Sequence, residues 1–189
     1  RDKQGYNFAG SYLDENYTTP FDFGLPIGNN ITIYANWEKI DDSIPVYRMY
    51  NPVNGEHLYT TDAHEVDVIF RTQGWGKEGT AWYTAKEGTP VYRLYNPKLG
   101  NHLYTSDKNE IRIITTTQGW VMDFNGEPVM YAGGDIPIYR LFNPGLQGQH
   151  HLTTDFNEYN TITKWGWQQE GEAMYAIKKG NPQSTTYYR

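Results

Sequence analysis

The sequence predicts an α+β fold, rich in β-strands, in which a small β spacer module precedes a domain made of three similar copies. The first observation is a repeat, because a Tyr-Arg pair begins at Tyr47, Tyr92 and Tyr139, at intervals of 45 and 47 residues. The second is that each copy passes from an alternating apolar pattern, typical of strands, to helical spacing. The third is that the first forty residues lack this motif. Together these observations predict two kinds of module in one chain.

The three copies carry the same features in the same order. They open with "VYRMYNPVNGEHLYTTD" from Val46, "VYRLYNPKLGNHLYTSD" from Val91 and "IYRLFNPGLQGQHHLTTD" from Ile138. The repeated positions, copy by copy, are Arg48, Asn51, His57, Asp62, Glu65, Trp75 and Tyr83; Arg93, Asn96, His102, Asp107, Glu110, Trp120 and Tyr131; and Arg140, Asn143, His150, Asp155, Glu158, Trp167 and Tyr175.

Each copy is predicted to fold as strand, turn, strand, short helix and strand. "VYRLYN" has the composition and alternation of a strand, and "NPKLGN" has the Pro and Gly of a turn. "HLYTS" then reads as the returning strand of a hairpin. "DKNE" predicts a helix start, with Asp as N-cap and Glu three residues later completing a capping box. Gly74, Gly119 and Gly166 stand where a glycine ends a helix, and a closing strand follows.

We expect the copies to span residues 44–88, 89–135 and 136–180 of a domain that covers residues 44–189. Three units that each bury too little apolar surface alone can share one core. The preferred arrangement is therefore a compact pseudo-threefold domain. A β-trefoil is the alternative on repeat length, although it has no helices and the predicted helix starts argue against it.

The first module is predicted to be a partial β repeat over residues 1–39, followed by a linker over residues 40–43. "GYNFAGSYLDENYTTPFDFGLPIGNNITIYANWEK" resembles the second half of the Listeria–Bacteroides repeat, also called the internalin B-repeat. The matched positions are Gly5, Tyr6, Phe8, Gly10, Tyr12, Asp14, Pro20, Phe21, Asp22, Phe23, Ile31, Thr32, Tyr34, Ala35 and Trp37, with Ser11 where the family usually has Trp. The resemblance implies a β-rich spacer of secreted and surface-attached bacterial proteins, mostly Gram-positive, whose first strands precede Arg1.

The three copies also resemble a known type of sequence. "YRLYNP..G.H.YTTD..E" followed by "GW..EG.AWY" is similar to a tandem repeat family of Gram-positive endolysins, surface glycosidases and other secreted proteins. The resemblance covers all three copies and implies attachment to a cell wall or a glycan. It assigns no chemistry to any residue.

Composition narrows the classes of partner. A formal charge of −6 and a pI of about 5.3, without a basic run, argue against nucleic acid as a ligand. The absence of Cys excludes disulfides and thiolate metal sites. No apolar run is long enough to predict a membrane span. Aromatic residues make up 16% of the chain, which suits both a core and a binding surface.

The repeated histidines His57, His102 and His150 allow three interpretations: local hydrogen bonding within each copy, contact with a sugar, or a shared metal site. A metal site would need the three rings within about 4 Å of one another, so local bonding is preferred and no metal or cofactor is predicted. His151, which occupies a position that is Leu in the other copies, is attributed to sequence drift.

The repeated carboxylates are interpreted as structural. Asp and Glu could form a glycosidase pair, but the predicted capping box explains both types of residue in every copy. An active site is usually built once, so no catalytic residue is predicted. The carboxylates assigned to capping are Asp62, Glu65, Asp107, Glu110, Asp155 and Glu158.

The repeated arginines Arg48, Arg93 and Arg140 lie on predicted strands between aromatic residues. An arginine in such a place usually has a carboxylate partner, and we expect the Asp or Glu of the same copy. A bidentate clamp for an anionic ligand group remains the alternative, so the three arginines also stand as candidate ligand contacts.

The aromatic residues carry the binding hypothesis, because sugar rings stack on Trp and Tyr. Trp75, Trp120 and Trp167 are assigned to the core. Tyr59 and Tyr104 stand two residues after the repeated histidine, on the same face of a strand. Together with Trp82, which is Met in the other copies, they are candidate ligand contacts.

The sequence therefore favours a non-catalytic, monomeric binding module, secreted or attached to the surface of a Gram-positive bacterium. The expected ligand is cell-wall polysaccharide, peptidoglycan or a host glycan. A protein-binding adhesin or a structural surface module is the alternative, and a hydrolase is the third. Repetition would also allow avidity from several weak sites.

Overall fold

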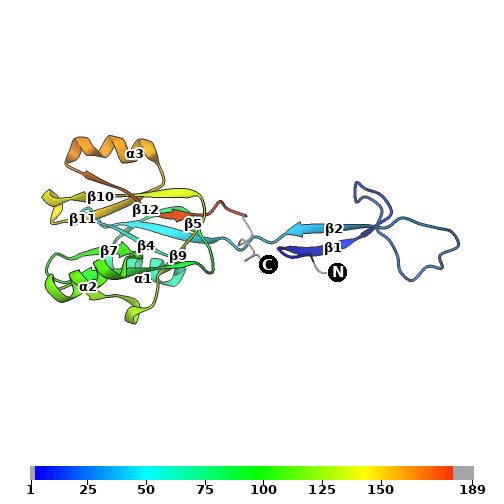
Figure 1. The fold of residues 1–189 in the computed structure, drawn as a ribbon, viewed down its shortest axis with the longest axis horizontal. Coiled ribbons are helices and arrows are strands. Elements are labelled where there is room, and N and C mark those ends of the chain that lie inside the picture. Colours follow the sequence, from blue (N-terminus) through cyan, green and yellow to red (C-terminus); the bar gives the residue numbers. More distant parts are fainter. Residues whose placement is uncertain (1–2, 181–189) are drawn as a thin grey trace. The chain divides into compact units, whose positions relative to one another are not determined.

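The computed structural model describes residues 3–180, so residues 1–2 and the last part of the predicted 44–189 domain, residues 181–189, lie outside it. The chain divides into two compact units (Figure 1). The first contains the described residues up to Asp42 and Gly180, and the second contains Ser43–Lys179. We describe each unit by itself.

The first unit is built on one antiparallel pair of strands. β1 (Tyr6–Tyr12) pairs with β2 (Tyr34–Lys39), and a bulge interrupts the register between Phe8 and Gly10. The long connection between them begins with a turn in which the Asp14 carboxylate accepts hydrogen bonds from backbone N–H groups of Thr18 and Thr19. Phe8 and Trp37, a cross-strand pair, pack edge to face at 5.4 Å.

In the second unit, each copy contributes a hairpin, a helix and closing strand segments that pair with the first strand of the hairpin. Copy 1 contains β3 (Ile44–Tyr50), β4 (His57–Thr60), α1 (Ala63–Gln73) and β5 (Gly76–Thr84). Copy 2 contains β6 (Thr89–Asn96), β7 (Asn101–Thr105), α2 (Lys108–Thr117), β8 (Val121–Met122), η1 (Phe124–Gly126) and β9 (Met130–Ala132). Copy 3 contains β10 (Ile136–Asn143), η2 (Pro144–Leu146), β11 (Gln149–Thr153), α3 (Phe156–Thr161), η3 (Ile162–Trp165) and β12 (Gln168–Ala176). The fold is α+β and rich in β-strands, as the sequence predicts.

The first strand of each copy is the central strand of its sheet. The strand orders are β4-β3-β5 in copy 1 and β11-β10-β12 in copy 3, all antiparallel. In copy 2 the closing strand is divided into β8 and β9, which both pair with β6, because η1 intervenes. The copies are therefore equivalent in topology, and copy 2 differs by a short insertion in its closing strand.

The predicted helix N-caps are confirmed, but the predicted capping boxes are wrong. Asp62, Asp107 and Asp155 each accept a hydrogen bond from the backbone N–H two residues later. In each copy, however, the N–H of this Asp donates to the hydroxyl of the Thr two residues earlier, for example Thr60. That hydroxyl takes the place that Glu would fill in a capping box. Glu65, Glu110 and Glu158 are therefore left to act elsewhere.

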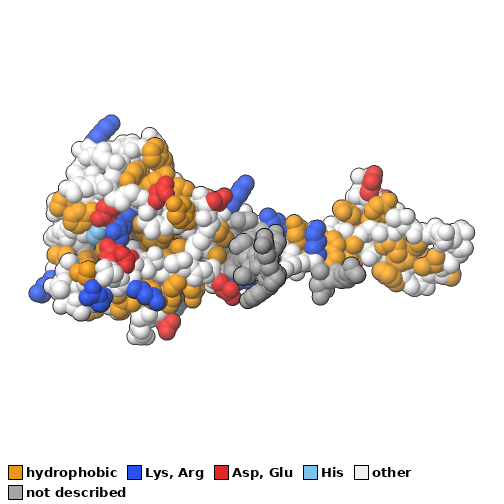
Figure 2. Space-filling view, in the orientation of Figure 1, with side chains coloured by type: hydrophobic (Ala, Val, Ile, Leu, Met, Phe, Trp, Pro, Cys, Tyr) orange, Lys and Arg blue, Asp and Glu red, His pale blue; other side chains and the backbone are white. Residues whose placement is uncertain are grey.

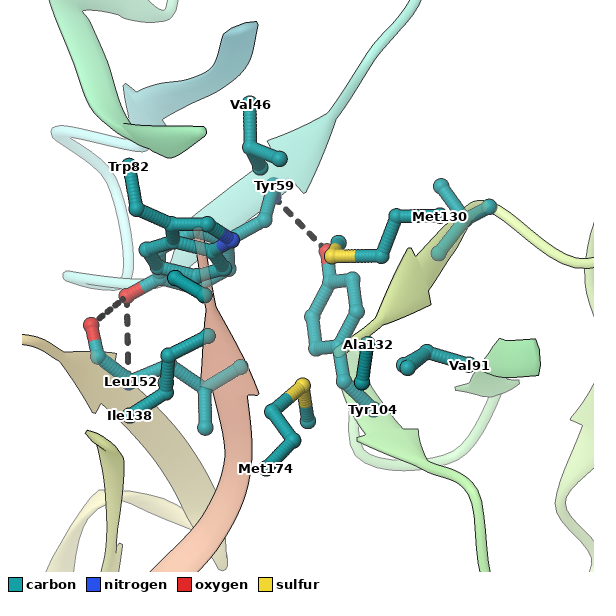
Figure 3. Packing of buried hydrophobic residues seen from close by; sticks show 12 residues of the cluster. Val46, Tyr59, Trp82, Val91, Tyr104, Met130, Ala132, Ile138, Leu152 and Met174 are labelled. Carbon is teal, nitrogen blue, oxygen red and sulfur yellow. Dashed lines mark hydrogen bonds between the residues drawn. The ribbon is translucent and has the colours of Figure 1, made fainter. Parts of the chain in front are cut away.

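The main core is made of equivalent residues from all three copies (Figure 3). The central positions are fully or almost fully buried. Taken in copy order, they are Val46, Val91 and Ile138; Tyr59, Tyr104 and Leu152; and Trp82, Met130 and Met174. On the other face of the sheets of copies 1 and 2, the helix covers a smaller cluster, such as Met49, Leu58 and Trp75 in copy 1.

The structure overturns the interpretation of Tyr59, Tyr104 and Trp82 as ligand contacts. Tyr59 is 0% exposed, Tyr104 2% and Trp82 5%, and the Tyr59 and Trp82 rings stack at 5.1 Å. The two hydroxyls join neighbouring copies, as the dashed lines of Figure 3 show. The Tyr104 hydroxyl accepts from the Tyr59 N–H at 2.8 Å, and the Tyr59 hydroxyl donates to the Leu152 carbonyl at 2.7 Å. The strand faces that carry Tyr59 and Tyr104, which we expected to contact a ligand, therefore pack into the shared core.

Candidate ligand sites between the copies

Every repeated arginine binds a carboxylate of its own copy that stands thirty residues further along the chain. The Nε atoms of Arg48, Arg93 and Arg140 each lie 2.6 Å from the carboxylate of Glu78, Asp123 and Glu170 respectively. These three acids follow the Gly-Trp pair and were not recognised from the sequence. The signal was present in the sequence, because a carboxylate occurs three residues after the tryptophan in every copy.

The other end of each guanidinium binds the helix glutamate of the preceding copy. Arg93 makes two hydrogen bonds to Glu65, at 2.6 and 3.2 Å, and Arg140 makes two to Glu110, both at 3.1 Å. Arg48 of copy 1 makes the corresponding contact with copy 3, so the three contacts form a cycle. This third contact is weaker, because Arg48 Nη1 lies 3.7 Å from Glu158. Each arginine therefore has a carboxylate partner in its own copy, as expected, but the repeated helix glutamate binds the arginine of the next copy instead of its own.

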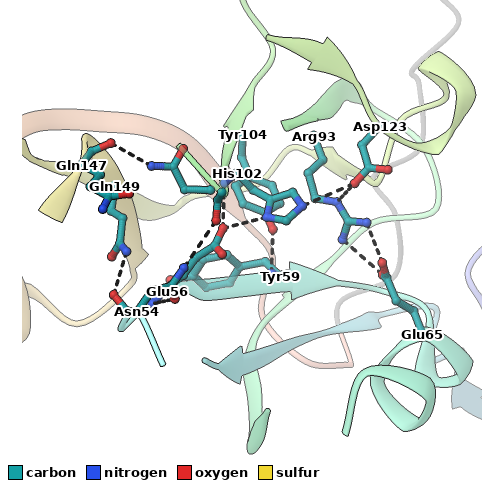
Figure 4. A network of polar contacts seen from close by, with 12 residues as sticks. Asn54, Glu56, Tyr59, Glu65, Arg93, His102, Tyr104, Asp123, Gln147 and Gln149 are labelled. Atoms are coloured by element: carbon teal, nitrogen blue, oxygen red, sulfur yellow. Dashed lines mark hydrogen bonds and ion pairs between the residues drawn. The ribbon is translucent and has the colours of Figure 1, made fainter. Parts of the chain in front are cut away.

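These contacts leave the arginines poorly suited to clamp a ligand anion. All three nitrogens of the Arg93 guanidinium bind carboxylates, and its side chain is 3% exposed. Figure 4 shows this group between Asp123 and Glu65. Paired, hydrogen-bonded charges of this kind fix the relative position of two elements. The arginines therefore join neighbouring copies.

The three repeated histidines lie beside these clusters, one at each interface. His57 Nε2 is 3.3 Å from Glu78, His102 Nε2 is 3.7 Å from Asp123, and His150 Nε2 is 3.8 Å from Glu170. Each ring also packs on the aromatic ring opposite it in the hairpin, at 4.9–5.3 Å; these partners are Tyr50, Tyr95 and Phe142. The histidines therefore belong to three separate sites.

Burial keeps two of these histidines neutral. Burial, with His151 and Arg48 nearby, lowers the pKa of His57 to about 3. Burial, with Arg140 nearby, lowers the pKa of His150 to about 4. At neutral pH both rings are therefore uncharged, and the carboxylates next to them, Glu78 and Glu170, are paired with arginines.

A second cycle of polar contacts lies next to the histidines, at one position of each hairpin (Figure 4). Glu56 accepts from both the N–H and Nδ1 of His102, each at 2.7 Å. The residues at the same position in copies 2 and 3 are Asn101 and Gln149, and each reaches the hairpin turn of the next copy. Asn101 donates to the Gln147 carbonyl at 3.0 Å, and Gln149 donates to the Asn54 carbonyl at 2.9 Å. Glu56 therefore provides a fixed acceptor for histidine at the interface of copies 1 and 2.

Two equivalent clefts open beside the clusters. Cleft 1/2, between copies 1 and 2, has a volume of about 430 Å³ and is lined by Asn51, Gln73, Trp75, Tyr95, His102 and Asp123. Cleft 2/3 has a volume of about 500 Å³ and is lined by the counterparts Asn96, Gln118, Trp120, Phe142, His150 and Glu170. Each cleft presents part of a tryptophan and an aromatic ring beside polar groups, which is the usual composition of a small-ligand pocket.

The clefts bring together some of the residues singled out from the sequence. His102 and His150 line them, as do Trp75 and Trp120, which are 7% and 6% exposed and mainly serve the clusters under the helices. Gln73 and Gln118 were missed, although both stand in the same Thr-Gln-Gly-Trp sequence at the end of a helix.

Among the described residues, the structure contains no group of three or more His, Asp or Glu side chains that could hold a metal ion. None of the helices in this part of the chain is long and apolar enough to cross a membrane. Figure 2 shows acidic and basic side chains interspersed on the face in view, without a large basic patch there.

The comparisons with known proteins identify one family. The family model described as "Domain of unknown function (DUF5648)" matches residues 45–177, the larger part of the chain. No curated protein and no solved structure matches the chain.

Proposed function

Because the chain belongs to the DUF5648 family, whose description assigns no function, we propose from its geometry that this protein is a non-catalytic, glycan-binding module. The observation that carries the proposal is the pair of equivalent clefts between consecutive copies. A flat aromatic ring beside imidazole, amide and carboxylate groups suits a sugar, which has apolar ring faces and hydroxyls around its edge.

The proposal includes the arrangement of the copies. We infer a closed pseudo-threefold domain, supported by the Arg–Glu contacts, which run from copy 2 to copy 1, copy 3 to copy 2 and copy 1 to copy 3. A helix in every copy disfavours the β-trefoil alternative. In this arrangement the two clefts are repeats of one site and can bind a repetitive polymer with avidity.

The setting of the module is proposed from the two sequence resemblances. These resemblances support a setting on a secreted or surface-attached protein of a Gram-positive bacterium, behind a spacer of the Listeria–Bacteroides type. The ligand would then be cell-wall polysaccharide, peptidoglycan or a host glycan. The module is proposed to act as a monomer without a cofactor.

The proposal that the module is not an enzyme rests on the contacts that the carboxylates beside the repeated histidines already make. The carboxylate beside the Nε2 atom of each repeated histidine, which is Glu78, Asp123 or Glu170, is already bound by an arginine at 2.6 Å, and this pairing occurs at every interface. A general acid or base should be free to exchange a proton with substrate. Here these groups support the packing of the copies.

The first test is retention of the purified protein on isolated Gram-positive cell walls, followed by a glycan array. We expect saturable retention that soluble wall fragments compete. The double variant Gln73→Arg/Gln118→Arg, which fills both clefts with long charged side chains, should weaken retention several-fold. Thr72→Arg/Thr116→Arg is the matched control, because these exposed residues precede the same helix ends without lining the two clefts.

Absence of retention on both walls and array would contradict the proposal and favour a protein-binding surface module. Release of sugars or wall fragments during the incubation would instead favour a hydrolase. Equal retention of the double variant and its control would show that the two clefts do not contribute to binding.

A further inference from the structure

The interface between copies 3 and 1 has a different composition from the other two. Four aromatic rings form a continuous row across it, in the order Tyr50, His57, His151 and Trp167. Their successive centroid distances are 5.3, 4.7 and 5.7 Å. The row exists because His151 stands where Leu58 is found in copy 1.

A tryptophan also replaces the glutamine that lines each of the other two clefts. Trp165 precedes the helix-ending Gly166, as Gln118 precedes its own helix-ending glycine. The backbone position is the same, because Asn143 Nδ2 donates to the Trp165 carbonyl at 3.3 Å and Asn96 Nδ2 donates to the Gln118 carbonyl at 3.3 Å. The third interface therefore has an extra aromatic side chain where the others have an amide.

These aromatic side chains are open to solvent. Trp165 is 67% exposed and Tyr50 is 38% exposed, and Trp167 is only partly buried. The corresponding tryptophans of copies 1 and 2, Trp75 and Trp120, are buried. Burying a tryptophan is strongly favourable, so this open cluster leaves apolar area available to a ligand.

The polar surroundings indicate the kind of sugar. Glu78 lies 3.3 Å from His57, and Glu158 lies 3.2 Å from His151. The cation nearest to both, Arg48, already binds Glu78 at 2.6 Å. Two carboxylates next to the aromatic row would repel an anionic sugar and can accept hydrogen bonds from hydroxyls.

We propose that the interface of copies 3 and 1 is the strongest glycan subsite of the domain, and that uncharged pyranose rings stack there on Trp165 and Tyr50. The inference rests on the proposed glycan-binding function and adds the location and the charge class of the sugar. His57 and Glu78 would bind hydroxyls at the edge of the stacked ring. The clefts 1/2 and 2/3 then act as weaker, auxiliary subsites.

The test compares the same replacement at equivalent positions. We expect Trp165→Ala to reduce affinity for isolated cell walls about tenfold or more, whereas Gln118→Ala stays within about twofold of wild type. Trp165→Phe should keep most of the affinity, because it keeps a ring to stack on. The thermal midpoints of these variants should match that of wild type, since both side chains are exposed.

The reciprocal variant and two soluble competitors sharpen the test. Gln118→Trp places the same ring at the end of cleft 2/3 and should strengthen wall binding by several-fold. An uncharged N-acetylglucosamine tetrasaccharide should compete with the walls, and a galacturonate tetrasaccharide, which is anionic, should not. Preferential competition by the anionic sugar would overturn the charge assignment.

The outcomes separate this inference from the function on which it rests. Wall binding by wild type that Trp165→Ala does not change would overturn the third subsite and leave the proposed function in place. Absence of wild-type binding to walls and array would overturn both.

Discussion

The interfaces of copies 1/2 and 2/3 are held by complete charge clamps, whereas the interface of copies 3 and 1 is held by a weaker clamp and an aromatic row. Arg93 and Arg140 each bind a helix glutamate through two hydrogen bonds, while Arg48 reaches Glu158 only at 3.7 Å. Glu158 instead binds His151 and Thr153. The difference teaches that the repeated arginine–glutamate contact can hold two interfaces together and be weaker at the third, where aromatic rings take its place.

The largest effect should come from breaking a complete clamp. Arg93→Ala removes a guanidinium that is 3% exposed and bound to both Glu65 and Asp123. We expect it to lower the free energy of unfolding by about 4 kcal/mol, because breaking a buried pair leaves its partners uncompensated. Arg48→Ala should cost about 1 kcal/mol, since that side chain is 25% exposed and its contact with Glu158 is long.

Urea unfolding of the two variants measures this difference. A matched control is Arg112→Ala, which removes an exposed arginine outside the clamps. Equal losses for Arg93→Ala and Arg48→Ala would show that the interface of copies 1 and 2 and that of copies 3 and 1 are energetically equivalent, which would contradict the difference expected from their contacts.

The second effect is the dependence of stability on pH. The folded-state pKa of His57 is about 3, below its unfolded value of about 6.5. Below pH 6.5 the unfolded chain binds a proton that the folded protein does not bind, so stability falls as pH falls. For one histidine this corresponds to about 1.4 kcal/mol per pH unit, or about 3 kcal/mol by pH 4.5.

Denaturant unfolding at a series of pH values between 7.5 and 4.5 tests this expectation. His57→Gln should flatten the profile by the contribution of one histidine, and His150→Gln should do the same at the interface of copies 2 and 3. His64→Gln is the control, because its ring is exposed on α1. A profile that keeps its wild-type slope in both variants would contradict the neutral, buried state of these rings.

Sequence reasoning predicted the element order and the helix N-caps because both depend on local chemistry. The roles of Glu65 and Arg93 could not be predicted, because a helix glutamate has two suitable partners and the choice depends on which copy is adjacent in space. Tyr59 illustrates the same limit: alternation placed it correctly on the face of His57, but only the packing of three copies shows that the face turns inward. Trp165 was missed because it stands outside the repeated pattern, as a replacement for glutamine.

A third effect comes from the tyrosine hydroxyls in the core. The Tyr59 hydroxyl bonds both the carbonyl and the N–H of Leu152, whereas the Tyr104 hydroxyl bonds one group, the N–H of Tyr59. Tyr59→Phe should therefore lower the free energy of unfolding by about 2 kcal/mol, and Tyr104→Phe by about 1 kcal/mol. Chemical denaturation measures both. A larger loss for Tyr104→Phe would reverse the order expected from these bonds.

The smallest expected change in stability tests why the third interface differs. His151→Leu restores the residue type of Leu58 and removes the hydrogen bond between His151 and Glu158. We expect stability within about 1 kcal/mol of wild type, because the lost hydrogen bond is offset by better burial of an apolar side chain. The pKa of Glu158 is lowered to about 2, chiefly by the hydrogen bond with His151, and should therefore rise in this variant.

A carboxyl-detected NMR titration measures the pKa of Glu158, and urea unfolding measures the stability. If the pKa of Glu158 instead stays near 2, Arg48 has closed onto it as Arg140 closes onto Glu110. That result would still identify His151 as the group that keeps the third clamp open. A loss of several kcal/mol would contradict this view, because it would show that the aromatic row itself holds copies 3 and 1 together.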